Sequence, residues 1–216
     1  MTIERPPVPP ELTVISGAGL RIHRKHLTDA VDDYRWRRDL GLLRFDGGPP
    51  VTESFSDFLQ HFEQGLRFIS GERRAYAIDT EDGLHVGNIM YYNADLARTA
   101  AELGVSIGHP EARGRGLGTA AVVLFLRYLW STYTFRRIYL HTFEWNERAR
   151  RCFERAGFDT VSQVVRGGAT FVRMETRREW WTLWDQEGRF EPILARAANP
   201  ATTRRPDPEP GPTEAG

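Results

Sequence analysis

The stretch that decides the fold lies near the middle of the chain and reads Arg113-Gly114-Arg115-Gly116-Leu117-Gly118-Thr119-Ala120. An apolar run at residues 103–107 precedes it, and a nearly continuous apolar run at residues 117–130 follows it. This order predicts a strand that turns through glycines into the N-terminus of a helix. Exposed backbone N–H groups and the positive end of the helix dipole make such a turn a site for a phosphate or a pyrophosphate.

The spacing of the glycines narrows the kind of ligand. Gly114, Gly116 and Gly118 alternate with other residues, whereas the dinucleotide-binding fingerprint reads G-x-G-x-x-G. A P-loop needs a lysine followed by Ser or Thr, and the only lysine of the chain is Lys25. Both nucleotide-binding classes are therefore disfavoured. A glycine-rich turn with solvated arginines stays open as the structural alternative.

A second patterned segment follows at residues 137–158. Residues 137–143 alternate as in a strand, with one face formed by Ile138, Leu140 and Thr142 and the other by Tyr139, His141 and Phe143. Asn146 is placed to cap a helix whose core-facing stripe is formed by Ala149, Cys152, Phe153 and Ala156. Gly157 stands where such a helix ends.

Together the two segments resemble the GNAT family of acetyl-CoA-dependent N-acetyltransferases. Residues 113–118 match the family's Arg/Gln-x-x-Gly-x-Gly/Ala pyrophosphate loop, and residues 146–158 match its Asn-x-x-Ala-x-x-x-Tyr-x-x-x-Gly-Phe segment. The similarity covers about residues 18–182 and is nearest to the RimJ/RimL branch, which acetylates the N-termini of ribosomal proteins. It implies an α/β fold with a mixed, mostly antiparallel sheet. That sheet splays between the strands at residues 101–107 and 137–143, the family's fourth and fifth, and is flanked by helices.

The resemblance implies acetyl-CoA as the co-substrate and a primary amine as the acceptor. Backbone N–H groups of the loop would hold the pyrophosphate, and the strand before the loop would pair with the pantetheine arm. Asn146 would contact the pantetheine or the sulfur, and a plain helix cap is its other interpretation. The residues predicted to bind the cofactor are Ser106, Ile107, Gly108, Arg113, Gly114, Arg115, Gly116, Leu117, Gly118, Thr119, Asn146 and Phe153.

Two steps of the chemistry stay open. Many relatives carry a tyrosine where this chain has Phe153, which cannot give a proton to the leaving thiolate. Three accounts are open: the thiolate leaves unassisted or through water, another hydroxyl reaches it, or the chain binds acyl-CoA without efficient catalysis.

The candidates for the base are Glu102 and His141. The structural alternative for Glu102 is a solvated strand residue, and that for His141 is a packed strand histidine. Cys152 is interpreted as a core thiol, so the transfer is expected to be direct.

The acceptor and the acyl group are the least determined features. An N-terminal peptide, a small polyamine, an aminoglycoside and a lysine side chain all remain open as acceptors. A sensor of acyl-CoA and a transferase of another acyl group such as succinyl are the alternative functions. The histidines show no metal-ligand spacing with cysteine or carboxylates, so no metal site is predicted.

Composition and the positions of the prolines predict the organisation of the chain. With 216 residues and a net charge of zero, we expect one domain with no pull towards nucleic acid or an anionic membrane. No apolar run has the length of a transmembrane helix. The single cysteine fits the reducing cytoplasm. A homodimer stays open. Proline content predicts an extended tail at residues 1–17 and a disordered tail at residues 186–216, around a domain at residues 18–185. The expected elements before the loop are a strand at 20–23, helices at 28–40 and 56–67, and strands at 74–79 and 84–92; after residue 158 they are strands at 160–165 and 169–175.

Overall fold

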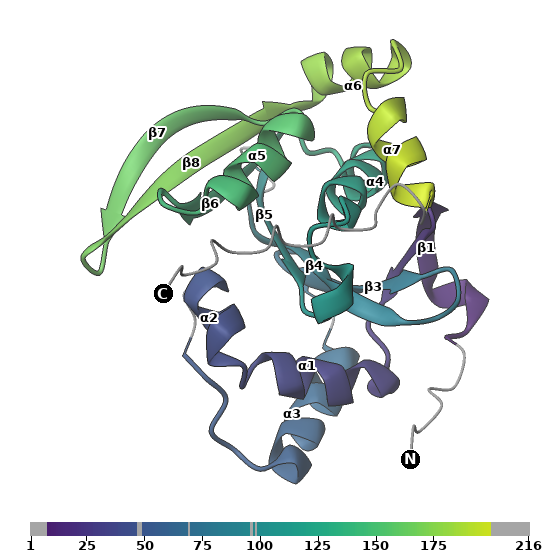
Figure 1. Cartoon of the computed structure of the whole chain (residues 1–216), viewed down its shortest axis with the longest axis vertical. Helices are drawn as coiled ribbons and strands as arrows, with labels where there is room; N and C mark the ends of the chain where they lie inside the picture. The colour runs from purple at the N-terminus through teal and green to yellow at the C-terminus, as the bar shows by residue number, and fades with distance from the viewer. Residues whose placement is uncertain (1–7, 47–48, 69, 96, 98, 200–216) are drawn as a thin grey trace, which may run out of the picture.

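The computed structural model describes residues 8–46, 49–68, 70–95, 97 and 99–199 (Figure 1). Its centre is one eight-stranded sheet in the order β1-β2-β3-β4-β5-β6-β8-β7. All neighbouring strands are antiparallel except β5 and β6, which are parallel, so the predicted mixed and mostly antiparallel sheet is confirmed. The strands are β1 Thr13–Gly17, β2 Leu20–Arg24, β3 Arg74–Thr80, β4 His85–Asp95, β5 Ala100–Ile107, β6 Arg137–Phe143, β7 Asp159–Arg166 and β8 Ala169–Arg177.

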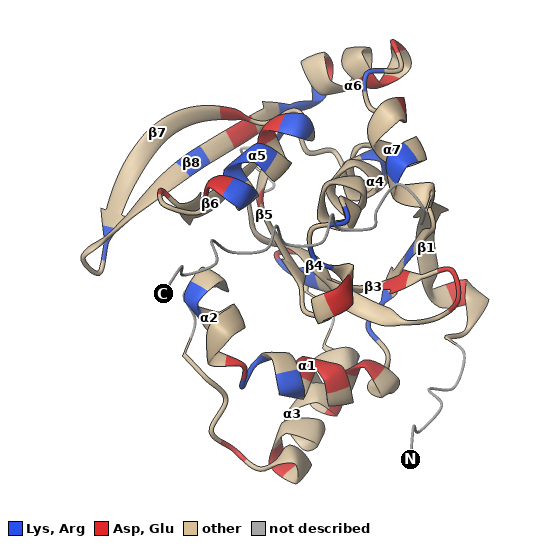
Figure 2. Cartoon of the chain, in the orientation of Figure 1, with Lys and Arg blue, Asp and Glu red and all other residues tan. Residues whose placement is uncertain are grey.

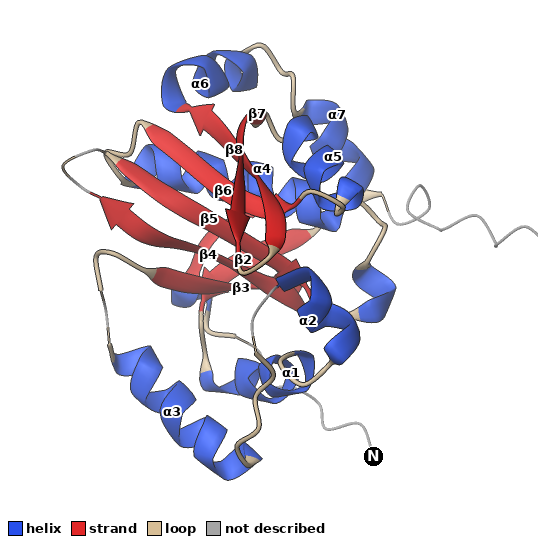
Figure 3. Ribbon diagram, turned by 90° about the vertical axis from the view of Figure 1, so that its left-hand side faces the viewer, coloured by secondary structure: helices blue, strands red, loops and turns tan. Residues whose placement is uncertain are grey.

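Helices cover both faces of this sheet. The 3-10 turns are η1 Pro10–Leu12, η2 Leu27–Asp29 and η3 Pro110–Ala112, and the helices are α1 Ala30–Trp36, α2 Leu40–Asp46, α3 Phe55–Arg67, α4 Leu117–Thr132, α5 Glu147–Arg155, α6 Arg178–Gln186 and α7 Glu191–Ala198. Helices α1, α2 and α3 lie together at one side of the molecule, apart from α4, α5, α6 and α7 (Figures 1 and 3). Among the described residues, no helix combines the length and the apolar character that crossing a membrane requires.

Alternation along β4 shows which face each group of helices covers. Ile89 is fully buried in the core that includes α4, whereas its neighbour Asn88 donates a hydrogen bond to Asp33 of α1. Successive side chains of a strand point to opposite faces, so α4 and α1 lie on opposite sides of the sheet. Acidic and basic residues both occur on the helices of each side of the sheet (Figure 2).

The sheet splits between β5 and β6. Their pairing covers residues 100–102 of β5 against residues 137–139 of β6, and beyond it β5 stays paired with β4 up to Ile107 while β6 stays paired with β8 up to Phe143. Each strand therefore turns an edge towards the other without a ladder between them. This is the splay that the sequence predicts at this position.

Helix α4 is apolar on nearly all sides because it is covered on nearly all sides. It contacts β1, β2, β4 and β5 of the sheet and also α5 and α7. The helix begins after Gly116, which caps it in a left-handed conformation with φ of 83°. Strand, glycine turn and helix therefore follow in the predicted order and fix the position of the loop.

The predicted boundaries of the tails are wrong where long-range packing decides the structure. Residues 13–17, expected in an extended tail, form β1 and pair with β2. The segment after residue 186, expected to be disordered, contains α7, in which Leu194 and Ala197 are buried against α4. Each segment is stabilised by a partner far away in the sequence. Residues 1–7 and 200–216 lie outside the described residues.

The prediction of one continuous helix over residues 28–40 is also wrong. Helix α1 ends at Trp36, and a second helix, α2, begins at Leu40. The carboxylate of Asp39 accepts hydrogen bonds from the backbone N–H groups of Gly41 at 2.8 Å and Leu42 at 3.3 Å. An aspartate that caps a new helix in this way satisfies N–H groups that a continuous helix would bond internally.

Candidate active site

The glycine loop presents backbone rather than side chains to its open side. Gly114 and Gly116 have left-handed φ values of 79° and 83°, and a Cβ built on either would meet nothing within 4 Å. Glycine adopts such φ values without steric cost, so the sequence permits this turn where other residues would strain it. At its end, the first N–H groups of α4 have no partner within the helix. The loop thus has the geometry of an anion site.

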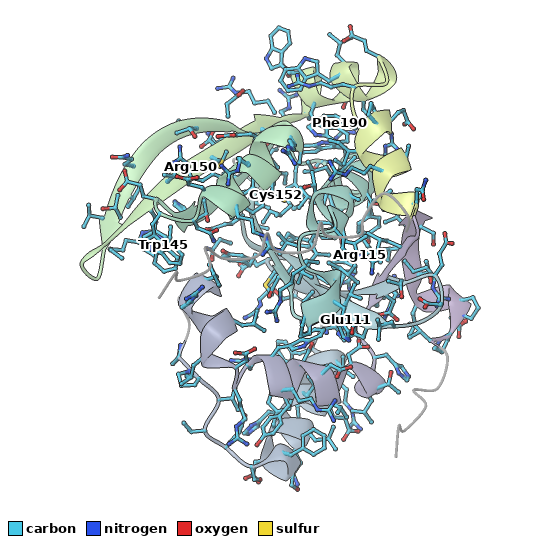
Figure 4. The ribbon with its side chains drawn as sticks, in the orientation of Figure 1. Glu111, Arg115, Trp145, Arg150, Cys152 and Phe190 are labelled. Atoms are coloured by element: carbon cyan, nitrogen blue, oxygen red, sulfur yellow. The ribbon has the colours of Figure 1, made fainter. Side chains whose placement is uncertain are left out.

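Arg113 is not the solvated arginine of the structural alternative. Its Nε donates to the carbonyl oxygen of Ile107 at 3.2 Å, and a second guanidinium nitrogen donates to the carbonyl oxygen of Gly108. The side chain ties the loop back to the end of β5. Arg115 is half-buried, and Figure 4 labels it close to the N-terminal end of α4. The structure therefore gives the two arginines of the motif different surroundings.

The end of β5 offers one of its predicted backbone groups to the splayed edge. Gly108 N–H donates to the carbonyl of Val86 at 3.0 Å, so it points towards β4. Backbone groups alternate between the two edges of a strand, which turns Ser106 N–H the same way and Ile107 N–H the other way. Of the three residues predicted to bind the pantetheine arm or polarise the acetyl carbonyl, Ile107 is the one whose N–H faces the gap between β5 and β6.

The two candidate bases meet where the ladder between β5 and β6 ends. His141 Nδ1 lies 2.7 Å from Glu102 Oε1, and their side chains are only 9% and 7% exposed. The other carboxylate oxygen, Oε2, accepts a hydrogen bond from Asn93 Nδ2 at 2.9 Å. Glu102 is therefore a buried, doubly bonded carboxylate, and its interpretation as a solvated strand residue is wrong. Their sequence separation hid this contact, which the parallel pairing of β5 with β6 creates.

This contact decides which nitrogen of His141 carries the lone pair that can accept a proton. A carboxylate can only accept, so Nδ1 carries the hydrogen that is shared with Glu102. In the neutral ring the lone pair then lies on Nε2. Among the described residues, the buried Nε2 of His141 has no hydrogen-bond partner. An imidazole held by a carboxylate on one nitrogen, with the lone pair on the other, has the arrangement of a general base.

The helix α5 places its predicted residues in mainly structural roles. Asn146 Oδ1 accepts the N–H of Ala149 at 3.1 Å, so the helix-cap interpretation is confirmed. Phe153 is 7% exposed and packs edge-on against Phe158, with the ring centroids 5.9 Å apart. Phenylalanine has no hydroxyl hydrogen to donate, and the ring of Phe153 lies in the hydrophobic core.

Cys152, labelled in Figure 4, lies on α5 where that helix meets α4. Its Sγ accepts a hydrogen bond from Thr119 Oγ1 at 3.3 Å, and burial raises the pKa of the thiol. A thiol with a raised pKa is a poor nucleophile, because the thiolate is the reactive form. This supports the interpretation of Cys152 as a packed thiol.

A buried charged cluster fixes α1 to the sheet, and no sequence pattern predicted it. The ammonium of Lys25 lies 2.7 Å from a carboxylate oxygen of Asp33, whose other oxygen accepts from Asn88 at 2.7 Å. His85 bridges Asp33 at 3.4 Å and Asp79 at 2.9 Å. Burial works to lower the pKa of His85, but its hydrogen bonds to the two carboxylates outweigh burial and raise that pKa.

The cluster has two consequences for the site. It holds α1 so that the ring of Trp36 lies on Gly108, where an added Cβ would come within 2.0 Å of the indole. It also brings possible metal-ligand atoms of His23, Asp29 and Asp79 within 4.8 Å of one another. The spacing of these residues in the sequence did not indicate such a set. His23 Nε2 already lies 3.1 Å from Asp79 Oδ2, so these two side chains lie close together without a metal ion between them.

Aromatic rings border the other end of the gap. Phe143 stacks on Phe171 of β8 at 4.4 Å and on Trp145 at 5.2 Å, and Trp145 in turn contacts Phe45 of α2 at 5.4 Å. Trp145 is 54% exposed (Figure 4). Phe143 belongs to the same face of β6 as His141, so these rings and the imidazole share one surface.

A known protein family matches most of the chain, including the glycine loop and the strands β5 and β6. Residues 20–159 match the family described as the acetyltransferase (GNAT) domain. The human alpha/beta-tubulin-N-acetyltransferase 9 is 33% identical over 84 residues, which are 38% of this chain and 41% of that protein. The match thus spans less than half of that relative.

Solved structures share the fold at low sequence identity. The spermidine N-acetyltransferase from Vibrio cholerae, in complex with CoA and spermine, has a TM-score of 0.68 at 17% identity and covers 76% of this chain and 99% of its own. A dodecameric structure of the Vibrio cholerae enzyme in an intermediate state has a TM-score of 0.64 at 18% identity, with 76% and 96% covered. With residues 20–159 matched, the chain belongs to the GNAT family.

Proposed function

We propose that the protein moves an acetyl group from acetyl-CoA directly to a primary amine. The observation that carries this proposal is the contact of His141 with Glu102 at the split of the sheet, 2.7 Å long and almost fully buried. A loop that only binds CoA has no need of an oriented imidazole beside the place where the thioester would lie. The pair favours an enzyme over a sensor of acyl-CoA.

In this proposal the open edge of β5 receives the cofactor. Backbone N–H groups of residues 115–119, at the turn into α4, hold the pyrophosphate, with Arg113 bracing the turn. The pantetheine arm then lies along residues 103–107, where β5 lacks its ladder to β6. Ile107 N–H is the backbone donor that faces this gap.

The proposed chemistry needs one proton carrier. The amine nitrogen attacks the thioester carbonyl, and His141 Nε2 takes the proton that the nitrogen loses. Glu102 stabilises the imidazolium that forms. When the intermediate collapses, the carbon–sulfur bond breaks and the proton passes from Nε2 to the thiolate, which gives the amide and CoA. His141 thereby supplies the proton that Phe153 cannot give.

The acceptor that the surface supports best is the α-amine of a peptide, which is also the substrate type of the RimJ/RimL branch. A polyamine needs several carboxylates for its several ammonium groups. Two carboxylates near His141 are already engaged: Glu102 is bonded twice, and Glu175 on the neighbouring strand β8 forms an ion pair with Arg173 at 2.6 Å. The neighbouring surface is aromatic, which suits a single amine on a peptide.

The experiment that tests this function is an acetylation assay on the full chain. Thiol release from acetyl-CoA is measured with tripeptides of different first residues and, in parallel, with spermidine and an aminoglycoside, and product masses locate the added acetyl group. We expect peptides to be acetylated at the α-amine. A preference for spermidine would refute the acceptor class, and no thiol release with any amine would refute the enzyme. Succinyl-CoA, run beside acetyl-CoA, decides the acyl group.

The assembly and the location of the protein are further parts of this proposal. We infer a homodimer formed through β7, the last strand of the sheet, because Val161 and Val165 on it are 57% and 72% exposed and an exposed strand edge invites pairing. Sedimentation of the full chain and of Val165→Lys tests this, and a monomer for the wild-type chain would refute it. A cytoplasmic location fits a single packed cysteine, Cys152.

A further inference from the structure

Strand β4 is irregular beside the paired carboxylate and imidazole. Its register with β5 is regular up to Tyr92, which lies opposite Glu102, and shifts before Asp95. Asn93 lies inside this shift, so β4 carries an extra residue relative to β5. A bulge of this kind bends a strand and re-aims its side chains, and bulges are over-represented next to active sites.

The backbone of Asn93 has the conformation that such a bulge requires. Its φ is 49°, in the left-handed region that few residues other than glycine enter. Asparagine is among those that tolerate it. In an unbroken strand Asn93 would point to the face opposite Tyr92, and therefore away from Glu102. The bulge instead brings the amide to that carboxylate.

The result is a line of three polar groups. Asn93 Nδ2 donates to Glu102 Oε2 at 2.9 Å, and Glu102 Oε1 accepts from His141 Nδ1 at 2.7 Å. Each carboxylate oxygen thus has its own donor, one on β4 and one on β6. A carboxylate held at both oxygens cannot rotate without losing a bond, so the amide fixes the oxygen that faces the imidazole.

We propose that Asn93 is a positioning residue for the proposed base, and this inference rests on the proposed function. Its amide holds Glu102 in the orientation that keeps the hydrogen of His141 on Nδ1 and the lone pair on Nε2. Without the amide, Glu102 can turn, and the imidazole can place its hydrogen on either nitrogen. A fraction of the molecules then lacks a base at the amine.

The test uses NMR of the full chain with ¹⁵N-labelled histidine. The ring nitrogens of His141 are assigned by their loss in His141→Gln, and Asn93→Ala is compared with the wild-type chain. We expect a single Nδ1–H tautomer in the wild-type chain and a mixture in Asn93→Ala. With acetyl-CoA and the best amine, kcat should fall about tenfold, by analogy with the loss on removing an outer partner of a metal-ligating histidine, while the KM for acetyl-CoA stays unchanged.

Asn93→Gly separates the amide from the backbone. Glycine adopts the left-handed φ more readily than alanine, so this variant keeps the bulge and removes only the amide. It should show the same mixed tautomers and the same loss of kcat as Asn93→Ala. An Asn93→Gly protein with the wild-type tautomer would overturn the positioning role. Full turnover in His141→Gln would refute the proposed base instead, and the tautomer result would still decide whether Asn93 orients the pair.

Discussion

Replacement of Phe190 by alanine tests whether the segment after residue 186 belongs to the folded unit. Its ring is fully buried and stacks on Trp181, with centroids 4.8 Å apart and planes 18° apart. Truncation of a buried phenylalanine costs about 3–5 kcal/mol, which includes the lost ring pair. For a chain of this size about 1 kcal/mol shifts Tm by roughly 2–4 °C, so Phe190→Ala should melt about 6–20 °C below the wild-type chain.

The assay is urea unfolding followed by tryptophan fluorescence, supported by a thermal melt. Leu183→Ala is the matched control, because Leu183 lies on α6 and is 46% exposed. The control should lose about 1 kcal/mol or less. If Phe190→Ala loses no more free energy of unfolding than Leu183→Ala, then α7 is not part of the cooperative fold.

Three further outcomes follow from the structure. Gly116→Asp places a strained residue and a negative charge on the open side of the loop, so calorimetry should show CoA affinity reduced at least about tenfold; unchanged affinity would remove the loop from the cofactor site. Although burial works to lower the pKa of His85, Asp33 and Asp79 raise it, so its stabilisation is complete below about pH 6.5 and is lost as pH rises through the raised pKa. Tm should therefore fall above that pH and fall less in His85→Gln, and equal slopes would contradict the argument. Dialysis against EDTA should leave Tm unchanged, because the contact of His23 with Asp79 needs no metal, and a lower Tm would show a structural metal.

Local patterns predicted those parts of the fold in which neighbours in sequence determine the structure. The strand predicted at residues 137–143 has the same bounds as β6, and its alternation matches the observed burial. Asn146 caps α5 as its side-chain chemistry favours. The glycines of the loop adopt the left-handed φ values that make the turn into α4 possible. In each case a short-range rule is sufficient.

Features that depend on distant partners were not visible in the sequence. Strand β1 and helix α7 lie in proline-rich surroundings, and only pairing with β2 or packing on α4 makes them regular. Glu102 and His141 could be named one by one, but their contact needs the parallel pairing of two strands separated by α4. Asn93 gave no signal, because a bulge depends on the register of two strands.

The measurement that tests the central claim most directly is the pH dependence of kcat/KM for the wild-type chain and for His141→Gln, with acetyl-CoA and the best amine of the panel. The account predicts that wild-type kcat/KM falls as pH drops, because only a neutral imidazole can accept a proton from the amine. His141→Gln should lose on the order of 100-fold in kcat/KM across the range, with CoA affinity retained in calorimetry. Glu102→Gln, which cannot stabilise an imidazolium, should follow in the same direction. A His141→Gln protein with wild-type kcat/KM and the same acid limb would contradict the claim that this imidazole is the base.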